Sequence, residues 1–215
     1  MIASEGSNKK KSTPIPAGMY PAVCYAACDR GTHHDERFDK DKREVVLIFE
    51  VPGVRIDIEK DGVTKSLPRA ISKTYTVSLH EKANMRKDLQ GWRGRPFTLE
   101  ELKGFKLENV VGKPCLLNLV PSECGKYTNI GGINPLMAGM EAPKQENPST
   151  YFSFDDCVDG VEPAWPEGMP NWIVDIAKES DEYRSLIAGI DATTSTATAP
   201  EPDPDDAGDD EDIPF

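Results

Sequence analysis

The sequence predicts a mainly β domain with a helical insertion, followed by one further helix and an acidic tail. Three observations indicate this class. Five segments show the apolar runs or the alternation of strands, a segment with helical periodicity lies between the third and the fourth, and the last residues have no periodicity. This element order is that of the OB-fold, a five-stranded Greek-key barrel with a helical insertion between strands 3 and 4.

The first two predicted strands are apolar runs separated by a charged loop. Residues 17–28 are small and apolar and follow a Pro-x-Pro-x-Gly segment. Residues 44–51 form a continuous apolar run rich in β-branched side chains, which we expect to end at Pro52-Gly53. Residues 29–43, with Phe38 as their lone aromatic side chain, are predicted to be a loop.

The third predicted strand follows a turn at Asp61-Gly62 and covers residues 71–79. Apolar and hydroxyl side chains alternate along it, which is typical of a half-buried strand. Its buried face consists of Ile71, Tyr75, Val77 and Leu79.

Two capping patterns predict the helical insertion. Residues 78–81 read Ser-x-x-Glu, a capping box that begins a helix, and residues 98–101 repeat the pattern as Thr-x-x-Glu before a short helix that ends at Gly104. The first helix has an apolar face with a spacing of i, i+4 and i+7, formed by Met85, Leu89 and Trp92.

The remaining predicted elements are two strands, at residues 114–120 and 127–133, and a helix that begins at Pro170-Asn171. Beyond Ile190 the composition predicts disorder. The expected organisation is an N-terminal arm (1–13), the OB-fold domain (14–138), an irregular segment with a C-terminal helix packed on or near the barrel (139–190), and a disordered acidic tail (191–215).

The net charge of −12 is unevenly distributed along the chain. Residues 191–215 carry nine acidic residues and no Lys or Arg, and residues 150–190 carry nine acidic and two basic residues. Residues 1–149 hold 19 acidic and 23 basic residues, a net charge of +4. A mildly basic body with an acidic tail is compatible with a nucleic-acid partner.

Five cysteines, an odd number, follow an N-terminus that lacks an apolar export segment, so we expect reduced thiols and a cytoplasmic location. If residues 22–28 form a strand, Cys24 and Cys28 lie on one face. Small buried hydrophobic side chains are favoured there over zinc ligands completed by His33 and His34. We expect no metal, no other cofactor and no membrane partner, since no stretch approaches the ~18 apolar residues of a membrane span.

The last seven residues, DDEDIPF, differ from an acidic tail that only adds charge and solubility, because they end in Ile-Pro-Phe. An exposed Phe at a chain end is useful as an anchor, because Phe215 offers an apolar surface and a carboxylate, and Pro214 lowers the entropy lost on docking. Residues 192–204, rich in Thr, Ala and Pro, form a tether that lets the tip reach a partner protein. The predicted partner-binding residues are Asp209, Asp210, Glu211, Asp212, Ile213, Pro214 and Phe215.

This tip closely resembles the C-terminal tip of bacterial single-stranded DNA-binding proteins, which ends in acidic residues followed by Ile-Pro-Phe. In that family the tip binds genome-maintenance enzymes, with Pro-Phe seated in a pocket lined by basic residues. The resemblance implies that replication and recombination proteins are partners of this chain.

The body of the chain resembles the single-stranded DNA-binding proteins of tailed bacteriophages. The resemblance lies in residues 73–120, with Trp-Arg-Gly, Phe-Thr-x-Glu-Glu and Asn-Val-Val-Gly-Lys-Pro-Cys, and in residues 169–183. It implies an OB-fold that coats and protects single strands during DNA replication, recombination or repair, in the host-cell cytoplasm if the chain is phage-encoded.

Sequence-independent binding of a single strand needs basic side chains for phosphates and aromatic faces for bases. Basic and aromatic residues interleave through the strand and loop region of this chain. The predicted DNA-binding residues are Phe38, Lys40, Lys42, Arg43, Arg55, Arg69, Lys73, Trp92, Arg93, Arg95, Lys126 and Tyr127.

The aromatic candidates have different alternatives. Phe38 has no apolar neighbour in its loop, which favours a stacking role slightly over a role as a loop anchor. For Tyr127 the two roles are about equally favoured. Tyr75 and Trp92 share faces with apolar residues, so a core position is favoured for both.

Two rival classes of function remain. An enzyme is not expected, because the sequence has no P-loop, no dinucleotide fingerprint, no His pair at i, i+4 and no Gly-x-Ser-x-Gly. The alternative is an adaptor or DNA mimic that binds host replication enzymes through the tail without binding DNA, although the +4 charge of residues 1–149 disfavours a mimic. The oligomeric state is open, and self-association is one option.

Overall fold

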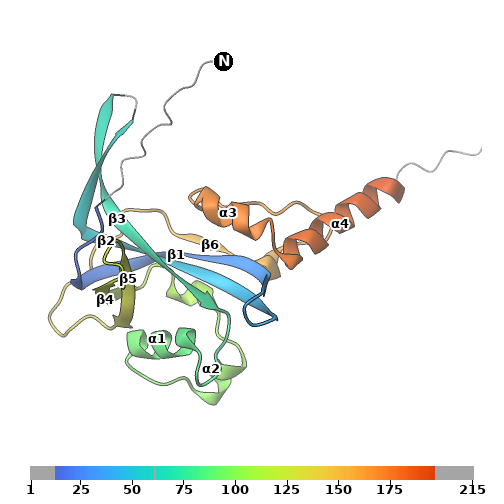
Figure 1. The fold of residues 1–215 in the computed structure, drawn as a ribbon. Coiled ribbons are helices and arrows are strands. Elements are labelled where there is room, and N and C mark those ends of the chain that lie inside the picture. Colours follow the sequence, from blue (N-terminus) through green and yellow to red (C-terminus); the bar gives the residue numbers. More distant parts are fainter. Residues whose placement is uncertain (1–12, 61, 197–215) are drawn as a thin grey trace, which may run out of the picture.

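A computed structural model of the protein describes residues 13–60 and 62–196, and within them one open sheet forms the centre of the molecule (Figure 1). The strands lie in the order β3-β2-β1-β4-β5, with antiparallel neighbours, and β6 pairs in parallel with β1. The mainly β class predicted from the sequence is confirmed. The strands are β1 (Gly18–Asp35), β2 (Lys40–Lys60), β3 (Val63–Thr76), β4 (Pro114–Pro121), β5 (Thr128–Asn134) and β6 (Thr150–Phe152).

The helices lie on opposite sides of the sheet (Figure 1). The predicted insertion between the third and fourth strands is confirmed and contains α1 (Asn84–Arg93), α2 (Leu99–Lys103) and the 3-10 turn η1 (Leu107–Val110). The other side is covered by η2 (Phe154–Asp156), α3 (Asn171–Ala177) and α4 (Asp181–Thr196).

Strands β1 and β2 are buried on both faces, which explains the continuous apolar run predicted as the second strand. On β2, Leu47 and Phe49 belong to a core shared with α1, whereas Val46 and Ile48 belong to a second core shared with α3 and α4. A strand covered on both faces has no polar positions to alternate with apolar ones.

A bulge in β1 separates two cysteines that the sequence placed on one face. The register of β1 against β2 shifts between Cys24 and Ala26, and one extra residue reverses the faces that follow. Cys24 therefore lies in the core with α1 and Cys28 in the core with α3, so the expectation of a shared face is wrong. Burial raises the pKa of the Cys28 thiol to about 12. Within residues 13–60 and 62–196, no group of three or more His, Cys, Asp or Glu is arranged to hold a metal.

The predicted loop at residues 29–43 is mostly paired strand. β1 continues to Asp35 and β2 begins at Lys40, so only residues 36–39 form the turn. Charged side chains are tolerated here because pairs of opposite charge, such as Asp35 with Lys42, lie across the two strands.

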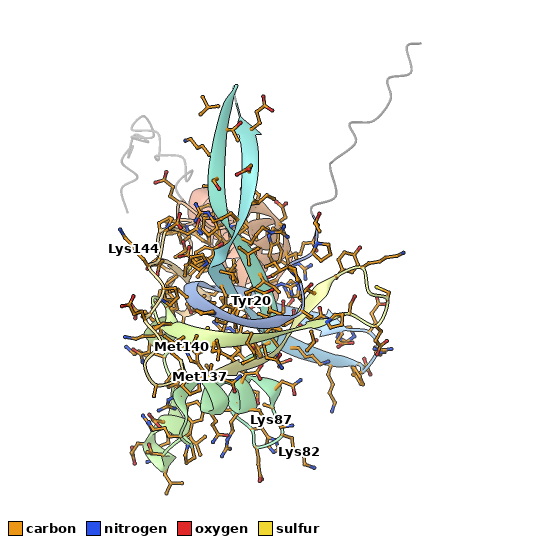
Figure 2. All side chains as sticks on the ribbon, turned by 90° about the vertical axis from the view of Figure 1, so that its left-hand side faces the viewer. Tyr20, Lys82, Lys87, Met137, Met140 and Lys144 are labelled. Atoms are coloured by element: carbon orange, nitrogen blue, oxygen red, sulfur yellow. The ribbon has the colours of Figure 1, made fainter. Side chains whose placement is uncertain are left out.

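The predicted end of the second strand at Pro52-Gly53 is also wrong. The pairing of β2 with β3 shifts between Val51 and Arg55, a bulge that accommodates a proline without a backbone donor, and β2 then continues to Lys60. The resulting β2–β3 hairpin projects away from the sheet (Figures 1 and 2). Its turn contains Gly62 at a φ of 75°, where the sequence predicted a turn.

Of the two predicted capping boxes, one is confirmed. At residues 98–101, Thr98 Oγ1 accepts from the N–H of Glu101, whose carboxylate accepts from the N–H of Thr98 at 2.9 Å. The other is wrong, because α1 begins at Asn84 and Ser78 Oγ accepts from the N–H of His80 instead. The buried face predicted for that helix is confirmed.

After β5 the chain is more ordered than its composition indicates. Residues 139–170 include β6 and η2, and the single helix expected from Pro170 is divided into α3 and α4. The buried Ser180 lies between them, where its hydroxyl donates to Ala177 O at 2.7 Å and accepts from the N–H of Tyr183. Helix α4 continues past Ile190 to Thr196. The rest of the predicted tail, including the partner-binding tip, lies outside the described residues.

None of the helices in the described part of the chain is both long and apolar enough to cross a bilayer.

Candidate nucleic-acid interface

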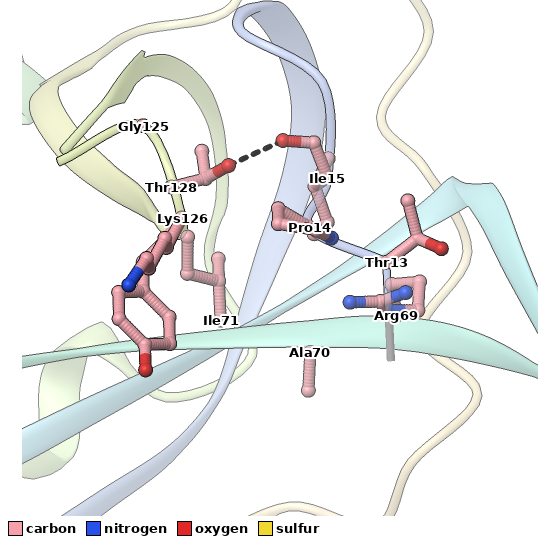
Figure 3. A pocket seen from close by; sticks show the side chains of 10 residues that line it. Thr13, Pro14, Ile15, Arg69, Ala70, Ile71, Gly125, Lys126 and Thr128 are labelled. Atoms are coloured by element: carbon pink, nitrogen blue, oxygen red, sulfur yellow. Dashed lines mark hydrogen bonds between the residues drawn. The ribbon is translucent and has the colours of Figure 1, made fainter. Parts of the chain in front are cut away.

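A cavity of about 710 Å³ opens where β3, the β4–β5 turn and the segment before β1 meet (Figure 3). It contains two basic side chains, one tyrosine and several apolar groups, all from segments far apart in the sequence. The lining residues are Arg69, Ala70 and Ile71 of β3, Gly125, Lys126, Tyr127 and Thr128 at the β4–β5 turn, and Thr13, Pro14 and Ile15 before β1.

One side of the cavity is fixed because β3 and β5, the two ends of the strand order, approach each other. Lys73 Nζ on β3 donates to Ile130 O on β5 at 3.1 Å and forms an ion pair with Asp88 at 2.6 Å. The lysine thus links the two strands to α1. Tyr75 Oη donates to the same Asp88 carboxylate at 2.7 Å, and this tyrosine is buried, as expected. Lys73 was predicted to bind DNA, but its ammonium group is held inside the fold.

The β4–β5 turn presents its side chains to solvent. The N–H of Tyr127 donates to Ser122 Oγ at 3.1 Å, the N–H of Ser122 donates to Tyr127 O at 2.8 Å, and Gly125 takes a φ of 67°. These bonds fix a tight turn, so that Lys126 is exposed and 66% of Tyr127 remains accessible.

The third wall is the segment before β1. Ile15 is buried in the core shared with α1, and its carbonyl accepts from Thr128 Oγ1 (Figure 3). Pro14 and Pro16 restrict the backbone on both sides of this anchor. Thr13 is consequently held at the rim of the cavity.

Arg69 and Lys126 are absent from the ion pairs found among the described residues. They line the same cavity as Tyr127. Two cations that have no ion-pair partner among the described residues thus share a cavity with an exposed aromatic ring. This combination meets the chemical needs of a single strand, namely phosphate neutralisation and a face for a base. The structure therefore brings together three of the twelve predicted DNA-binding residues.

Arg43 is neutralised within the fold. Its Nε lies 3.2 Å from the buried carboxylate of Asp29, and its Nη1 lies 2.8 Å from Asp155. Burial opposes the charge of Arg43, but the hydrogen bonds to both carboxylates outweigh it and raise the pKa of the guanidinium. Asp29 also accepts from the N–H groups of Gly31 and Phe154, so the cluster joins β1 to η2.

Arg55 is also paired, at the base of the projecting hairpin. It contacts the carboxylate of Glu146 and donates to Ser66 O at 2.6 Å. Glu146 is itself held in place, because its N–H donates at 2.6 Å to Glu50, a fully buried carboxylate on β2.

Trp92 provides no free face for a base. Only 7% of it is exposed, its Nε1 donates to Pro114 O at 2.8 Å, and its ring lies 5.7 Å from that of Phe49. The core position favoured from the sequence is what the structure has, and we do not retain a stacking role.

The two arginines that follow Trp92 converge on one carboxylate. Arg93 pairs with Glu101 and lies 4.5 Å over the ring of Phe97, and Arg95 pairs with Glu101 at 2.9 Å. Arg95 and the N–H of Thr98 lower the pKa of Glu101 to about 2. Both guanidinium groups stabilise the α1–α2 connection, although 54% of the Arg95 side chain stays exposed.

Phe38 lies at the β1–β2 turn, outside the cavity, and is 59% exposed. Lys42 Nζ lies 4.4 Å from the centre of its ring while also pairing with Asp35, and Lys40 is exposed. This turn is a second site with an exposed aromatic ring, and its basic side chains stand among exposed carboxylates such as those of Asp39 and Asp41. The prediction that Phe38 stacks on bases stays a prediction.

The sequence missed the residues of the segment before β1 that line the cavity. Thr13 and Pro14 belong to what was expected to be a free arm and its boundary, and Ile15 was not assigned a role. A lone apolar Ile between two prolines was the available signal that this segment is anchored. Comparisons of the chain with protein-family models, with curated proteins and with solved structures found no match.

Proposed function

We propose that this protein binds single-stranded DNA without sequence preference, through the cavity between β3 and the β4–β5 turn. The observation that carries the proposal is the convergence of Arg69, Lys126 and Tyr127 from distant segments on one cavity. Cations without carboxylate partners can neutralise phosphates and release counterions, and an exposed ring can stack on a base. In the cell this activity would coat and protect single strands during replication, recombination or repair.

We further propose that the fold is of the OB type, a partly open barrel in which the open sheet curls so that β3 approaches β5. The strand order β3-β2-β1-β4-β5 and the helix between β3 and β4 support this, as does the Lys73 link between β3 and β5. In OB-folds, oligonucleotides bind on strands 2 and 3 between the loops that connect strands 1–2 and 4–5. The cavity uses β3 and the β4–β5 turn, and the patch around Phe38 lies on the β1–β2 turn.

The acidic C-terminal region supports placing the strand at this cavity. Residues 150–190, with nine acidic and two basic residues, cover the opposite face of β1 and β2 through η2, α3 and α4. None of them lines the cavity. The acidic side chains therefore repel a DNA strand from the face of the sheet that is covered by η2, α3 and α4.

The direct test is titration of a fluorescent oligothymidine at several salt concentrations. The full chain should bind at low salt, and Arg69→Ala/Lys126→Ala should weaken binding. The slope of log K against log[salt] should fall by about 0.7 for each lost phosphate contact, about 1.4 in total. The stability of this variant should stay within about 0.5 kcal/mol of the wild type, because neither side chain has an ion-pair partner among the described residues.

The matched control is Lys82→Ala/Lys87→Ala. Both lysines are exposed, Lys82 just before α1 and Lys87 on α1, at the end of the molecule away from the projecting hairpin (Figure 2). The control removes the same charge and should keep the wild-type slope. If the wild-type protein does not bind at low salt, the proposal is wrong, and the adaptor function becomes the better one.

We propose that the tip, Asp209 to Phe215, recruits replication and recombination proteins to the coated strand. Its support is the sequence pattern of acidic residues followed by Ile-Pro-Phe. Deletion of residues 209–215 should abolish capture of such enzymes and leave the affinity for oligothymidine equal or higher, because a competing polyanion is removed. Markedly weaker DNA binding by the truncated protein would contradict this.

A further inference from the structure

We propose that the projecting β2–β3 hairpin carries a second contact surface for single-stranded DNA, an aliphatic face that takes the strand where it leaves the cavity. This inference rests on the proposed function and adds a surface that does not line the cavity. The hairpin consists of residues 55–60 of β2 paired with residues 63–68 of β3, and it extends beyond the rest of the sheet (Figures 1 and 2).

The two faces of the hairpin differ in chemistry. Side chains alternate between the faces along each strand, and residues paired across the two strands share a face. Ile56 is paired with Leu67, and Ile58 is paired with Lys65. We call this surface the hairpin face, and its described side chains are those of Ile56, Ile58, Val63, Lys65 and Leu67.

The aliphatic side chains of the hairpin face are open to solvent. Ile58, Val63 and Leu67 are 45%, 55% and 41% exposed, and none of the three belongs to either core. Aliphatic groups gathered on one exposed surface are typical of a binding site rather than of a face made for water.

On β3 the hairpin face continues directly into the cavity. Arg69 and Ile71 follow Leu67 at a spacing of two, so their side chains leave the strand on the same side, and both residues line the cavity. From Arg69 to Val63 the strand advances six residues, which is about 20 Å. A single strand that leaves the cavity along β3 therefore meets the hairpin face next.

The charges of the hairpin favour DNA as the occupant of this face. Its carboxylates, Asp57 and Glu59, alternate onto the opposite face. Lys65 is absent from the ion pairs found among the described residues, so it is available to a phosphate. A second copy stacked on this face by two-fold symmetry would instead bring two Lys65 side chains together without a carboxylate.

The base of the hairpin is held in place. Arg55 on β2 contacts the carboxylate of Glu146 and donates to Ser66 O on β3 at 2.6 Å, which ties both strands to the segment before β6. The N–H of Glu146 donates to the buried Glu50 at 2.6 Å. A hairpin fixed in this way loses little conformational entropy when a strand docks on it.

Aliphatic contacts give this surface a signature that differs from that of the cavity. Leu and Ile side chains contact base faces or insert between them in other protein–DNA complexes. Burial of apolar area does not release counterions, so the hairpin face should strengthen binding with little dependence on salt. Only strands long enough to extend beyond the cavity should gain from it.

The test compares Ile58→Ser/Leu67→Ser with the full wild-type chain, using fluorescence anisotropy of labelled oligothymidines of about 4 and about 16 nucleotides over a salt series. The variant should bind the longer strand about tenfold more weakly, with an unchanged slope of log K against log[salt]. It should bind the shorter strand as the wild type does, which also shows that its cavity is intact. Lys65→Ala should lower the slope by about 0.7 for the longer strand alone.

The matched control is Val158→Ser/Val161→Ser, which removes two aliphatic side chains, 66% and 55% exposed, from the segment between η2 and α3. This control should bind both oligothymidines as the wild type does. Light scattering of the wild-type chain without DNA completes the test, and we expect the hairpin variant to have the same oligomeric state.

The outcomes separate this inference from the proposed function. Wild-type affinity of the hairpin variant for the longer strand, or an equal loss for both strands, would overturn the hairpin contact and leave the cavity proposal standing. A wild-type oligomer that the hairpin variant cannot form would assign the face to a second copy and overturn the contact with DNA. Absence of wild-type binding at low salt would overturn both proposals.

Discussion

Arg43 on β2 and Arg69 on β3 lie on neighbouring strands of one sheet, yet their surroundings differ. Arg43 sits between the carboxylates of Asp29 and Asp155, under the acidic C-terminal region. Arg69 lines an open cavity with Lys126, and no ion pair among the described residues includes it. The same residue type thus holds the fold together at one site and is available to a ligand at the other.

The comparison shows why basic residues in a sequence are poor markers of a nucleic-acid site by themselves. A basic side chain that is already paired with a carboxylate gains little from a phosphate, because it must first leave that partner. A cation without such partners carries counterions, and their release favours binding. Arg43, Lys73 and Arg93 belong to the first kind, and Arg69 and Lys126 to the second.

The largest expected effect concerns Arg43, the arginine that is paired with carboxylates. Arg43→Ala should lower the free energy of unfolding by about 3 kcal/mol, because the carboxylate of Asp29, 5% exposed, loses its counterion. This figure is at the lower end for a buried pair, since 29% of the Arg43 side chain is exposed. Urea denaturation at neutral pH measures the change.

Arg37→Ala, at the exposed β1–β2 turn, is the control and should change the free energy of unfolding by less than about 0.5 kcal/mol. A loss below about 1 kcal/mol for Arg43→Ala would show that Asp29 does not depend on this arginine. The comparison between paired and unpaired arginines would then fail.

The next effect concerns the aromatic ring in the cavity. Tyr127→Ala should weaken oligothymidine binding by about 1–3 kcal/mol, roughly 5- to 150-fold, if a base stacks on the exposed ring. Tyr127→Phe keeps the face and should bind almost as the wild type does. A loss for both variants would point to the hydroxyl rather than to stacking.

Phe38→Ala, measured in the same titration, sharpens this comparison. An effect as large as that of Tyr127→Ala would extend the interface from the cavity to the β1–β2 turn. No effect would confine the bound strand to the side of the molecule formed by β3 and the β4–β5 turn.

The smallest expected effect is a change in labelling rate at Cys124, an exposed cysteine of the β4–β5 turn. The Ser122 hydroxyl and the N–H of Lys126 lower the pKa of its thiol, which favours the reactive thiolate. Cys24, Cys28 and Cys115 are buried, and burial raises the pKa of each. A maleimide should therefore modify Cys124 well before these three.

Saturating oligothymidine should slow the labelling of Cys124 several-fold, because the turn that carries it also lines the cavity. Mass spectrometry of the labelled peptide follows the rate. An unchanged rate at saturation would place the DNA elsewhere on the molecule.

Much of the fold could be predicted because its signals are local. The apolar face of α1, the capping box at residues 98–101 and the alternation along β3 up to Tyr75 follow from residues close in sequence. Val77, predicted to lie on the buried face of that strand, comes after β3 and is 41% exposed. The strand ends that depend on pairing with a neighbouring strand were not predicted correctly. β1 and β2 extend into charged residues because each pairs with the other, and the bulge after Val51 lets β2 pass a proline.

The candidate site could be predicted only in part, because its residues are selected by contacts between distant parts of the chain. The twelve residues proposed from the sequence included Arg69, Lys126 and Tyr127, but nothing local distinguished these from Arg43 or Arg93. Arg43 contacts a carboxylate 112 positions away, and Thr128 Oγ1 contacts Ile15 across 113 positions. Pairings at such separations leave no periodic signal in the sequence.

The sequence by itself determined the mainly β class, the helical insertion between the third and fourth strands, and the division into a mildly basic body and an acidic C-terminal region. These follow from periodicity and composition, which each segment carries alone. Only the tertiary structure decided which basic side chains are neutralised and which line a cavity. A charge is free or paired according to the groups that folding places beside it, and here those groups come from distant parts of the chain.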